Sequence, residues 1–462
     1  MSGAGDVLID HVLALQGSAL AAPVQDAALS FLHDTLAVGV AGRHAPLADT
    51  VCALAQRWSG TASASASSGA CGLLGRPGLR LTAPYAAFVN AYQIHSQEFD
   101  CVHEPAVAHP LATVLAVLLA QAQQDAPLRG EDLLAALVGG VDVVATLGVA
   151  ATTPLKFFRP ATCGIFGSVA ALCRLRRLDR GTSIHAFGHA LSFASGTMQA
   201  HLEGQPTLAL QVAAAARSAL EAVDLAVAGI PAPAASLDGP YGHLRLFEDG
   251  HDIARALAHL GRPHAITELS WKPFPTGRAA HGGIVAIQTL VRDHGAVAGA
   301  VERLDYHAPP LIARLVGRAA FAGMGTAHAR LCLPYLGAVA LQRGSVGLAD
   351  FGPGQLADAA TLALAARISV HVDANPDPAA FGPAQLRATL RDGRVITLAV
   401  DRQFGSPAWP LSPAEQGQKA RACLEFGGLG AAHEALADAV RALPQAADAA
   451  AALACVFGDV PT

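Results

Sequence analysis

The spacing of apolar residues predicts a chain that is mostly helical. Apolar residues recur three and four positions apart over most of residues 1–58 and from residue 83 to about 229, which is the period of an amphipathic helix. The second stretch has breaks at Pro127, Gly139-Gly140, Pro154, Pro160, Gly181 and Pro206. Residues 60–80 begin with many small residues and predict a loop. Residues 230–265 predict a long irregular segment, because prolines and glycines recur in them.

The pattern changes to period two between about residues 265 and 400. Residues 366–374 alternate between apolar and polar, and residues 386–400 predict two short strands around Asp392-Gly393, a strong hairpin signal. Further strands are predicted at 265–271 and 299–307. Helices are predicted at about 276–294, 325–343 and 354–364, and again from residue 412 onward.

These elements predict a mainly α protein with an α+β lid. We expect residues 1–265 to form the first segment of an all-helical domain, residues 266–402 to form a smaller α/β lid domain, and residues 403–462 to return to the helical domain. The crevice between two such bodies is a common place for a ligand site.

Composition narrows the classes of function. Hydrophobic residues make up 52% of the 462 residues and aromatic residues only 5%, which favours closely packed helices. The net charge of −5 gives no basic surface for nucleic acid. Apolar runs such as 111–120 are far short of the ~20 residues that span a bilayer, and no secretory signal pattern opens the chain. The eight cysteines are scattered without CxxC pairs, as in a reducing compartment, so we expect a cytoplasmic protein that does not bind membranes.

The densest group of titratable residues lies in residues 95–110. Its 16 residues hold three histidines, two glutamates and one aspartate, although only 15% of the chain is charged. Pro110 opens an apolar stretch and is favoured at the first position of a helix. His109 is therefore expected at a helix N-terminus, where free N–H groups and the helix dipole attract an anion.

Two other segments place a cation beside a proline that is expected to begin a helix. Arg159 precedes Pro160, and Lys272 precedes Pro273 and Pro275, with Arg278 and His281 three apart in the following stretch. If the three helix starts converge, fixed cations and imidazoles surround one pocket. Such a pocket suits a small di- or tricarboxylate and proton transfer at the carbon beside a carboxylate.

Other motifs give weaker signals. His185 and His189 have a spacing that can bind zinc, but the glutamate of an HExxH helix is absent, so a packed or surface pair is expected. His95 and His201 are expected to be histidines satisfied by their neighbours. The glycine-rich stretches lack the spacing of a nucleotide-binding loop. We predict no metal ion and no cofactor.

In their order and spacing, several segments resemble the MmgE/PrpD family, which includes 2-methylcitrate dehydratase, cis-aconitate decarboxylase and iminodisuccinate epimerase. The segments are 34–42 (DTLAVGVAG), 90–100 (NAYQIHSQEFD) with His103 and His109-Pro110, 163–171 (CGIFGSVAA), 194–196 with Glu203-Gly204, 272–275 (KPFP) with His281, 335–344 and 405–411 (GSPAWPL). The resemblance covers nearly the whole chain. It implies a discontinuous helical domain with an α/β lid, no cofactor, and a homodimer.

The chain departs from the family pattern at four places, which predicts a divergent member. The family's Asp-Phe-Asp-Asp is here residues 98–101 (EFDC), and Arg159 stands where many members have histidine. Leu208 replaces a lysine, and Gly277 stands where a cysteine or histidine is common, with Arg278 beside it as a replacement charge. An arginine stays protonated, so Arg159 would bind a carboxylate rather than move a proton.

The resemblance implies a lyase in which His109 exchanges the proton beside a carboxylate of a small di- or tricarboxylate. We expect His103, Asp100 and Lys272 to take part in catalysis with His109. The substrate-binding residues are then Glu98, Arg159, Arg278 and His281.

Three alternatives remain open from the sequence. Dehydration, decarboxylation and the epimerisation of a dicarboxylate all need the same residue types. A carboxylate-binding paralogue without activity is a second alternative, because the family's lysine and one of its histidines are replaced. A metal-dependent hydrolase built on the histidine cluster is a third and weaker one.

Overall fold

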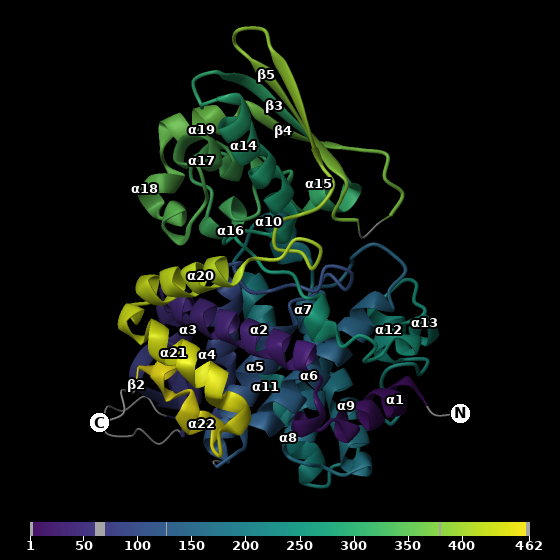
Figure 1. The fold of residues 1–462 in the computed structure, drawn as a ribbon. Coiled ribbons are helices and arrows are strands. Elements are labelled where there is room, and N and C mark those ends of the chain that lie inside the picture. Colours follow the sequence, from purple (N-terminus) through teal and green to yellow (C-terminus); the bar gives the residue numbers. More distant parts are fainter. Residues whose placement is uncertain (1–2, 61–69, 126, 378–379, 459–462) are drawn as a thin grey trace.

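The computed structural model describes residues 3–60, 70–125, 127–377 and 380–458. Figure 1 shows two bodies, a large helical one that contains both ends of the described chain and a smaller one with a sheet. The mainly α fold with a small α/β part is confirmed. We call the two parts the helical body and the α/β body.

The helical body is built from long helices with small residues at their contacts. Its main helices are α1 (Ala4–Ala14), α2 (Ala22–Ala41), α3 (Ala48–Trp58), α4 (Ala83–Ser96), α5 (Pro110–Gln124), α6 (Gly130–Val149), α7 (Arg159–Thr162), α8 (Gly164–Leu175), α9 (Arg180–Phe193), α10 (Gln199–Glu203), α11 (Thr207–Val227), α12 (His243–Phe247) and α13 (Ile253–Ala258). The C-terminal helices α20 (Pro413–Phe426), α21 (His433–Ala442) and α22 (Ala449–Ala452) complete it.

The predicted break at Gly139-Gly140 is wrong, because both glycines lie inside the continuous helix α6. A Cβ added at Gly140 would stand 2.8 Å from the carbonyl oxygen of Gly167 in α8, and one added at Gly167 would stand 2.6 Å from the carbonyl oxygen of Gly140. The two glycines therefore let two buried helices approach backbone to backbone. Helix α6 is long and apolar enough to span a membrane, but 89% of its apolar window is buried inside the protein, as in a core helix.

The α/β body has a second hydrophobic core, formed by residues between Phe274 and Val400. Its four-stranded sheet has the order β4-β3-β5-β6, with bounds β3 (Val301–Ala308), β4 (Ile368–Val372), β5 (Ala384–Leu390) and β6 (Val395–Val400). Strands β3 and β4 are parallel and need a long crossover. Its helices are α14 (His281–His294), α15 (Pro310–Val316), α16 (Thr326–Ala329), α17 (Leu333–Arg343), α18 (Pro353–Leu356) and α19 (Ala359–Ala365).

The strong strand signals are confirmed and three weaker predictions are wrong. The Asp392-Gly393 turn joins β5 to β6, with Gly393 at φ 87°. The loop predicted at 60–80 contains the hairpin β1 (Cys71–Leu73) and β2 (Arg76–Leu81), while residues 61–69 lie outside the described residues. The strand predicted at 265–271 is instead a 3₁₀ turn, Ala265–Glu268. The segment predicted as irregular at 230–265 contains the short helices α12 and α13.

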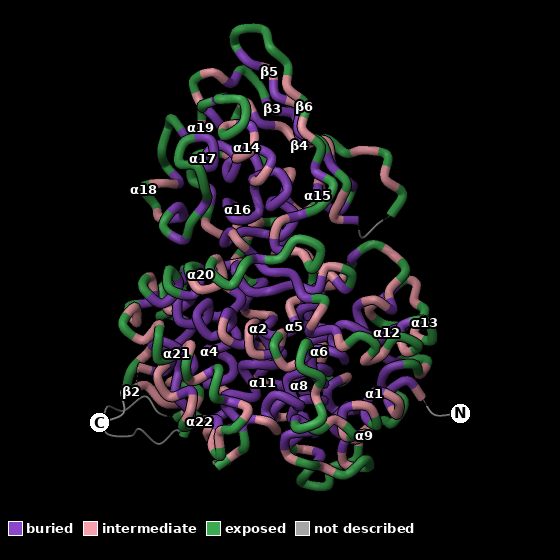
Figure 2. The backbone as a smooth tube through the Cα atoms, in the orientation of Figure 1, coloured by how far each residue is buried: buried purple, intermediate pink, exposed green. Residues whose placement is uncertain are grey.

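A buried ion pair attaches the returning C-terminal helices to the first part of the chain. Lys419 of α20 lies 2.7 Å from Asp34 of α2, and both side chains are buried. Lys419 also donates to the carbonyl oxygen of Phe99 at 2.9 Å and lies over the Phe99 ring. Figure 2 shows buried backbone concentrated inside the helical body, with α20 along its edge.

We predict that Lys419→Met lowers the free energy of unfolding by about 3–5 kcal/mol, because it leaves the buried Asp34 carboxylate without its cation. Equilibrium unfolding in urea measures this change. The double variant Asp34→Asn/Lys419→Met should lose less than the single variant, since no charge is then left unpaired. Arg441→Ala, which breaks an exposed pair with Asp438, should cost about 0–1 kcal/mol. A loss for Lys419→Met no larger than that of the exposed control would contradict the prediction.

Candidate active site

The segment between α4 and α5 brings most of the predicted residues together. Helix α4 ends at Ser96 and α5 begins at Pro110, so His109 is the N-cap residue of α5, as predicted. The intervening loop is held at one point by a bridge between Val102 and Ser270, which lies shortly before the α/β core begins at Phe274. The site therefore lies where the two bodies meet.

Asp100 is the centre of the site. One oxygen of its carboxylate, Oδ2, lies 3.1 Å from Nδ1 of His95 and 3.1 Å from Nδ1 of His109. The two rings contact each other edge to face, with centroids 4.8 Å apart. Asp100 and His95 are buried, whereas the His109 side chain is 13% exposed. Because Asp100 contacts Nδ1 of both rings, Nε2 of each imidazole is not used in this contact and could exchange a proton.

The environment moves the pKa values of the two histidines in opposite directions. Burial lowers the pKa of His109, and the opposing effect of Asp100 does not restore it. Burial also lowers the pKa of His95, but the Asp100 carboxylate, its hydrogen bond and Glu98 together raise it above its usual value. Burial raises the pKa of Asp100, yet the two imidazoles hold it well below the usual range. His95 therefore keeps its proton to higher pH than His109 does, while Asp100 stays a carboxylate.

Glu98 and Lys272 form a second pair beside this cluster. Lys272 Nζ lies 2.8 Å from Oε2 of Glu98, and the Lys272 side chain is completely buried. Glu98 has φ 50°, a left-handed backbone conformation that is uncommon for a residue with a side chain and costs on the order of 1 kcal/mol. Burial raises the pKa of Glu98, but Lys272 and the two histidines lower it to about 2, so the carboxylate is charged.

Arg278 and His281 lie behind this pair in a connected network. Arg278 Nε donates to Glu104 at 2.7 Å, and Nη1 donates to the carbonyl oxygen of Phe404 at 2.6 Å. Nη1 also lies 3.1 Å from Nδ1 of His281. Burial and the neighbouring Arg278 and Lys272 hold the pKa of His281 well below its usual value, so this buried ring is neutral. The network connects the loop of the helical body to the α/β body.

The predicted helix start after Lys272 is wrong. Residues 271–277 are not helical, with bends at 273–276, and the helical structure begins with the 3₁₀ turn at Arg278–Ala280. Pro273 and Pro275 prevent an earlier start of the helix, because proline cannot donate the backbone hydrogen bonds that a helix interior needs. Gly277 follows them and also disfavours a helix. Lys272 is fixed by its ion pair with Glu98 and not by a helix terminus.

Arg159 and His103 lie apart from the central cluster. Arg159 forms a two-pronged pair with Glu248, at 2.8 and 2.9 Å, and both side chains are buried. His103 Nδ1 accepts from the backbone of Ala106 at 3.2 Å, and its Nε2 lies 3.6 Å from Glu268. Neither residue lines the two cavities described next. The structure therefore does not place Arg159 or His103 in the cavity that His109 lines.

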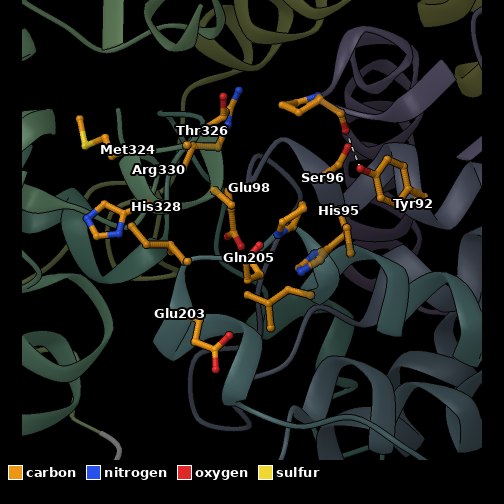
Figure 3. A pocket seen from close by; sticks show the side chains of 18 of the residues that line it. Tyr92, His95, Ser96, Glu98, Glu203, Gln205, Met324, Thr326, His328 and Arg330 are labelled. Carbon is orange, nitrogen blue, oxygen red and sulfur yellow. Dashed lines mark hydrogen bonds between the residues drawn. The ribbon is translucent and has the colours of Figure 1, made fainter. Parts of the chain in front are cut away.

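Two adjoining cavities lie at the junction of the bodies. The larger has a volume of about 390 Å³ and is lined by His95, Glu98, Gln205, His328 and Arg330 among others. Figure 3 shows Glu98 extending into it between His95 of the helical body and His328 of the α/β body. The smaller, of about 70 Å³, contains the exposed edge of His109. Glu98, Leu208 and Leu331 line both cavities, so a ligand in the larger one reaches toward His109.

Sequence reasoning missed two residues of the site. His95 was expected to be satisfied by neighbours, but its buried Nε2 has no hydrogen-bond partner among the described residues. Its position five residues before Asp100 was the available signal. Arg330 lines the larger cavity and donates to the carbonyl oxygens of Gln97 and Pro275, both at 2.6 Å. No local motif marks Arg330, because its partners are distant in sequence.

Two clusters have donors of the kind that bind divalent metal ions. The donor atoms of His95, Asp100 and His109 lie within 4.8 Å of one another, and so do those of His11, Asp142 and His264. In both clusters the imidazoles are hydrogen bonded to one carboxylate oxygen, so a metal ion would have to replace the shared protons. His185 and His189 form a packed pair on α9 and bond to backbone carbonyls.

Comparison with known proteins gives matches over both parts of the chain. Residues 6–256 match the MmgE/PrpD N-terminal domain and residues 274–444 match the MmgE/PrpD C-terminal domain. The chain is 28% identical to cis-aconitate decarboxylase of Mus musculus over 407 residues, which cover 84% of this chain and 80% of that protein. It is 28% identical to cis-aconitate decarboxylase of Homo sapiens over 366 residues, covering 75% and 74% of the two chains. It is 27% identical to cis-aconitate decarboxylase-like protein oryM of Aspergillus oryzae over 433 residues, covering 87% and 86%.

We predict that the two central histidines titrate on opposite sides of the usual histidine pKa of 6.5. In NMR titrations of the protein with isotope-labelled histidine, His109 should lose its proton below that value and His95 above it. The variants His95→Gln and His109→Gln assign the two signals. Because the Asp100 carboxylate raises both pKa values, Asp100→Asn should move both midpoints to lower pH. Coinciding midpoints for the two histidines in the unmodified protein would contradict the prediction.

Proposed function

The chain belongs to the MmgE/PrpD family, and from this membership and the geometry of the junction we propose that it is a cofactor-independent lyase acting on a small di- or tricarboxylate. The observation that carries the proposal is the single Asp100 carboxylate shared by two imidazoles whose pKa values move apart. A pair of titratable groups with divergent pKa values is the usual arrangement of a base and an acid in one site.

In this proposal His109 is the base. Asp100 binds its Nδ1, which fixes the ring with Nε2 free toward the cavity, and the lowered pKa keeps that nitrogen unprotonated near pH 7. His95 is the acid, because its side chain lines the larger cavity, its buried Nε2 has no hydrogen-bond partner among the described residues, and its raised pKa keeps it protonated to higher pH than a free histidine. Asp100 is a positioning residue that stabilises the imidazolium. Lys272, released from Glu98 or shared with it, stabilises the negative charge that develops beside the substrate carboxylate.

The three reactions of the family use this pair differently. In a dehydration the base removes a carbon-bound proton and the acid protonates the leaving hydroxyl. In a decarboxylation the bond to the departing CO₂ breaks, its electron pair stays on the carbon, and the acid delivers a proton there. In an epimerisation the two groups exchange protons on one carbon. The similarity to cis-aconitate decarboxylases supports the lyase reactions first.

Leu208 limits which substrates are expected. It lines both cavities at the position where the family has a lysine, so one cation is absent from the wall that faces the ligand. Arg159, the other departure, has its charge satisfied by Glu248. These differences favour a substrate related to, but different from, that of the typical members. The homodimer and the cytoplasmic location implied by the resemblance stay predictions.

We predict that the purified protein turns over one member of a panel of cis-aconitate, 2-methylcitrate and iminodisuccinate or a close analogue, and that His109→Gln lowers kcat by about 10²–10⁴-fold. Assays in D₂O identify the reaction: released CO₂ indicates decarboxylation, an ultraviolet-absorbing alkene indicates dehydration, and deuterium uptake without net product indicates epimerisation. His294→Gln, which changes an exposed histidine at the end of α14, is the matched control and should keep full activity.

Two results would oppose this function. Full activity of His109→Gln would remove the site assignment, and ligand binding in thermal-shift assays without any turnover would indicate a carboxylate-binding paralogue. The rate should also be unchanged by a strong chelator. Loss of activity on chelation, restored by a divalent metal, would instead support the metal-dependent alternative at His95, Asp100 and His109.

We predict a bell-shaped dependence of kcat/KM on pH. Activity should fall as the pH drops through the lowered pKa of His109, because the base becomes protonated, and should fall as the pH rises through the raised pKa of His95, because the acid loses its proton. Asp100→Asn should move the alkaline limb to lower pH, since the carboxylate no longer stabilises the His95 imidazolium. An unmoved alkaline limb in this variant would exclude His95 as the acid.

A further inference from the structure

An open cleft with basic walls lies outside the cavity that contains His109. It has a volume of about 710 Å³, and its charged and titratable lining residues are Lys156 and His201 of the helical body and Arg314 and Arg318 of the α/β body. The residues that line it include no aspartate or glutamate. Figure 1 shows the two helices beside it, α10 and α15, at the level where the bodies meet.

The arginines of this cleft differ from three cations that the sequence predicted for the site. Lys272, Arg278 and Arg159 each have a carboxylate partner within 3 Å. Within the described ranges of the chain, neither Arg314 nor Arg318 forms an ion pair with a carboxylate. These three cations are paired, whereas the two cleft arginines are not; among the described residues, Arg330 of the larger inner cavity likewise bonds only to the uncharged Gln97 and Pro275.

Arg318 is also only partly satisfied by hydrogen bonds. Its Nη2 donates to the carbonyl oxygen of His201 at 3.0 Å and lies 3.2 Å from the His201 ring. Its Nη1 is buried and has no hydrogen-bond partner among the described residues. Lys156 on the opposite wall is paired with the exposed Asp249 at 2.7 Å. Arg314 is exposed to solvent.

The cleft adjoins the inner site through two shared residues. Met198 and His201 line both the cleft and the cavity of His109. His201 Nε2 lies 3.2 Å from the carbonyl oxygen of Leu315, so the ring bridges the two bodies at the boundary between cleft and cavity. The His201 side chain therefore separates an anion held in the cleft from the cavity that the proposed base, His109, lines.

We propose that this cleft is a docking site for small polycarboxylate anions, in which Arg314 and Arg318 bind the ligand before it passes His201 into the inner cavity. The choice of ligand rests on the proposed function. A concave wall of unpaired cations raises the local concentration of an anion and speeds its association, and salt weakens both effects.

The test is the binding of tricarballylate, a saturated tricarboxylate, measured by calorimetry at low and at high ionic strength. Arg314→Glu should weaken binding about tenfold at low ionic strength and flatten the salt dependence, with Arg314→Gln in between. Arg391→Glu makes the same charge change at an exposed position of the β5–β6 turn in the same body and should leave binding unchanged. Arg314 is the residue of choice because it is exposed and its side chain has no hydrogen-bond or ion-pair partner in the part of the chain that the structure describes.

The outcomes separate this proposal from the proposed function. If Arg314→Glu binds tricarballylate as Arg391→Glu does at low ionic strength, the docking site is overturned, even where turnover of a panel substrate is normal. If no panel substrate is turned over but Arg314→Glu still weakens binding, the docking site stands and the lyase function fails. Where turnover is found, Arg314→Glu should lower kcat/KM by a similar factor and leave kcat nearly unchanged, and a change in kcat alone would count against docking.

Discussion

A buried carboxylate, Asp100, is the constraint on which the rest of the site depends. Taking a charge out of water costs several kcal/mol unless partners replace the lost solvation, and here two imidazoles do so through one oxygen. The requirement fixes both rings, one at the end of α4 and one at the start of α5. The Asp100 carboxylate also raises the pKa of both rings, but burial outweighs it at His109, whereas at His95 Asp100 and Glu98 together outweigh burial, so the two pKa values move apart. Position, tautomer and charge in the site thus follow from one buried group.

The ion pairs around this group also hold the two bodies together. Lys272–Glu98 and Arg278–Glu104 each join a residue of the α4–α5 loop to a residue near the start of the α/β body. The carboxylates that tune the site are therefore the same ones that attach the α/β body to the helical body. A change at Glu98 or Glu104 would alter the relative placement of the bodies as well as the charge near His109.

The sequence was most informative where the determinants are local. Period-two alternation and Asp392-Gly393 predicted the hairpin, and Pro110 predicted the helix that places His109. The Arg159–Glu248 pair could not be predicted, because 89 residues separate its members and only the packed fold brings them together. The role of His95 was missed for a related reason: burial of its Nε2 depends on tertiary contacts, and an isolated histidine carries no pattern. The Gly139-Gly140 pair was misjudged as a break because glycine signals both helix ends and close helix packing.

The ion pair between Asp34 and Lys419 has a consequence for the order in which the protein is made. Its two residues are 385 positions apart, and the whole α/β body is encoded between them. During synthesis the helical body therefore emerges with a buried acid whose cation does not yet exist, while the α/β body, which has its own core, is completed first. The helical body closes only when α20 leaves the ribosome. Packing of the C-terminal helices against the N-terminal helices is thus the final step in the assembly of the helical body.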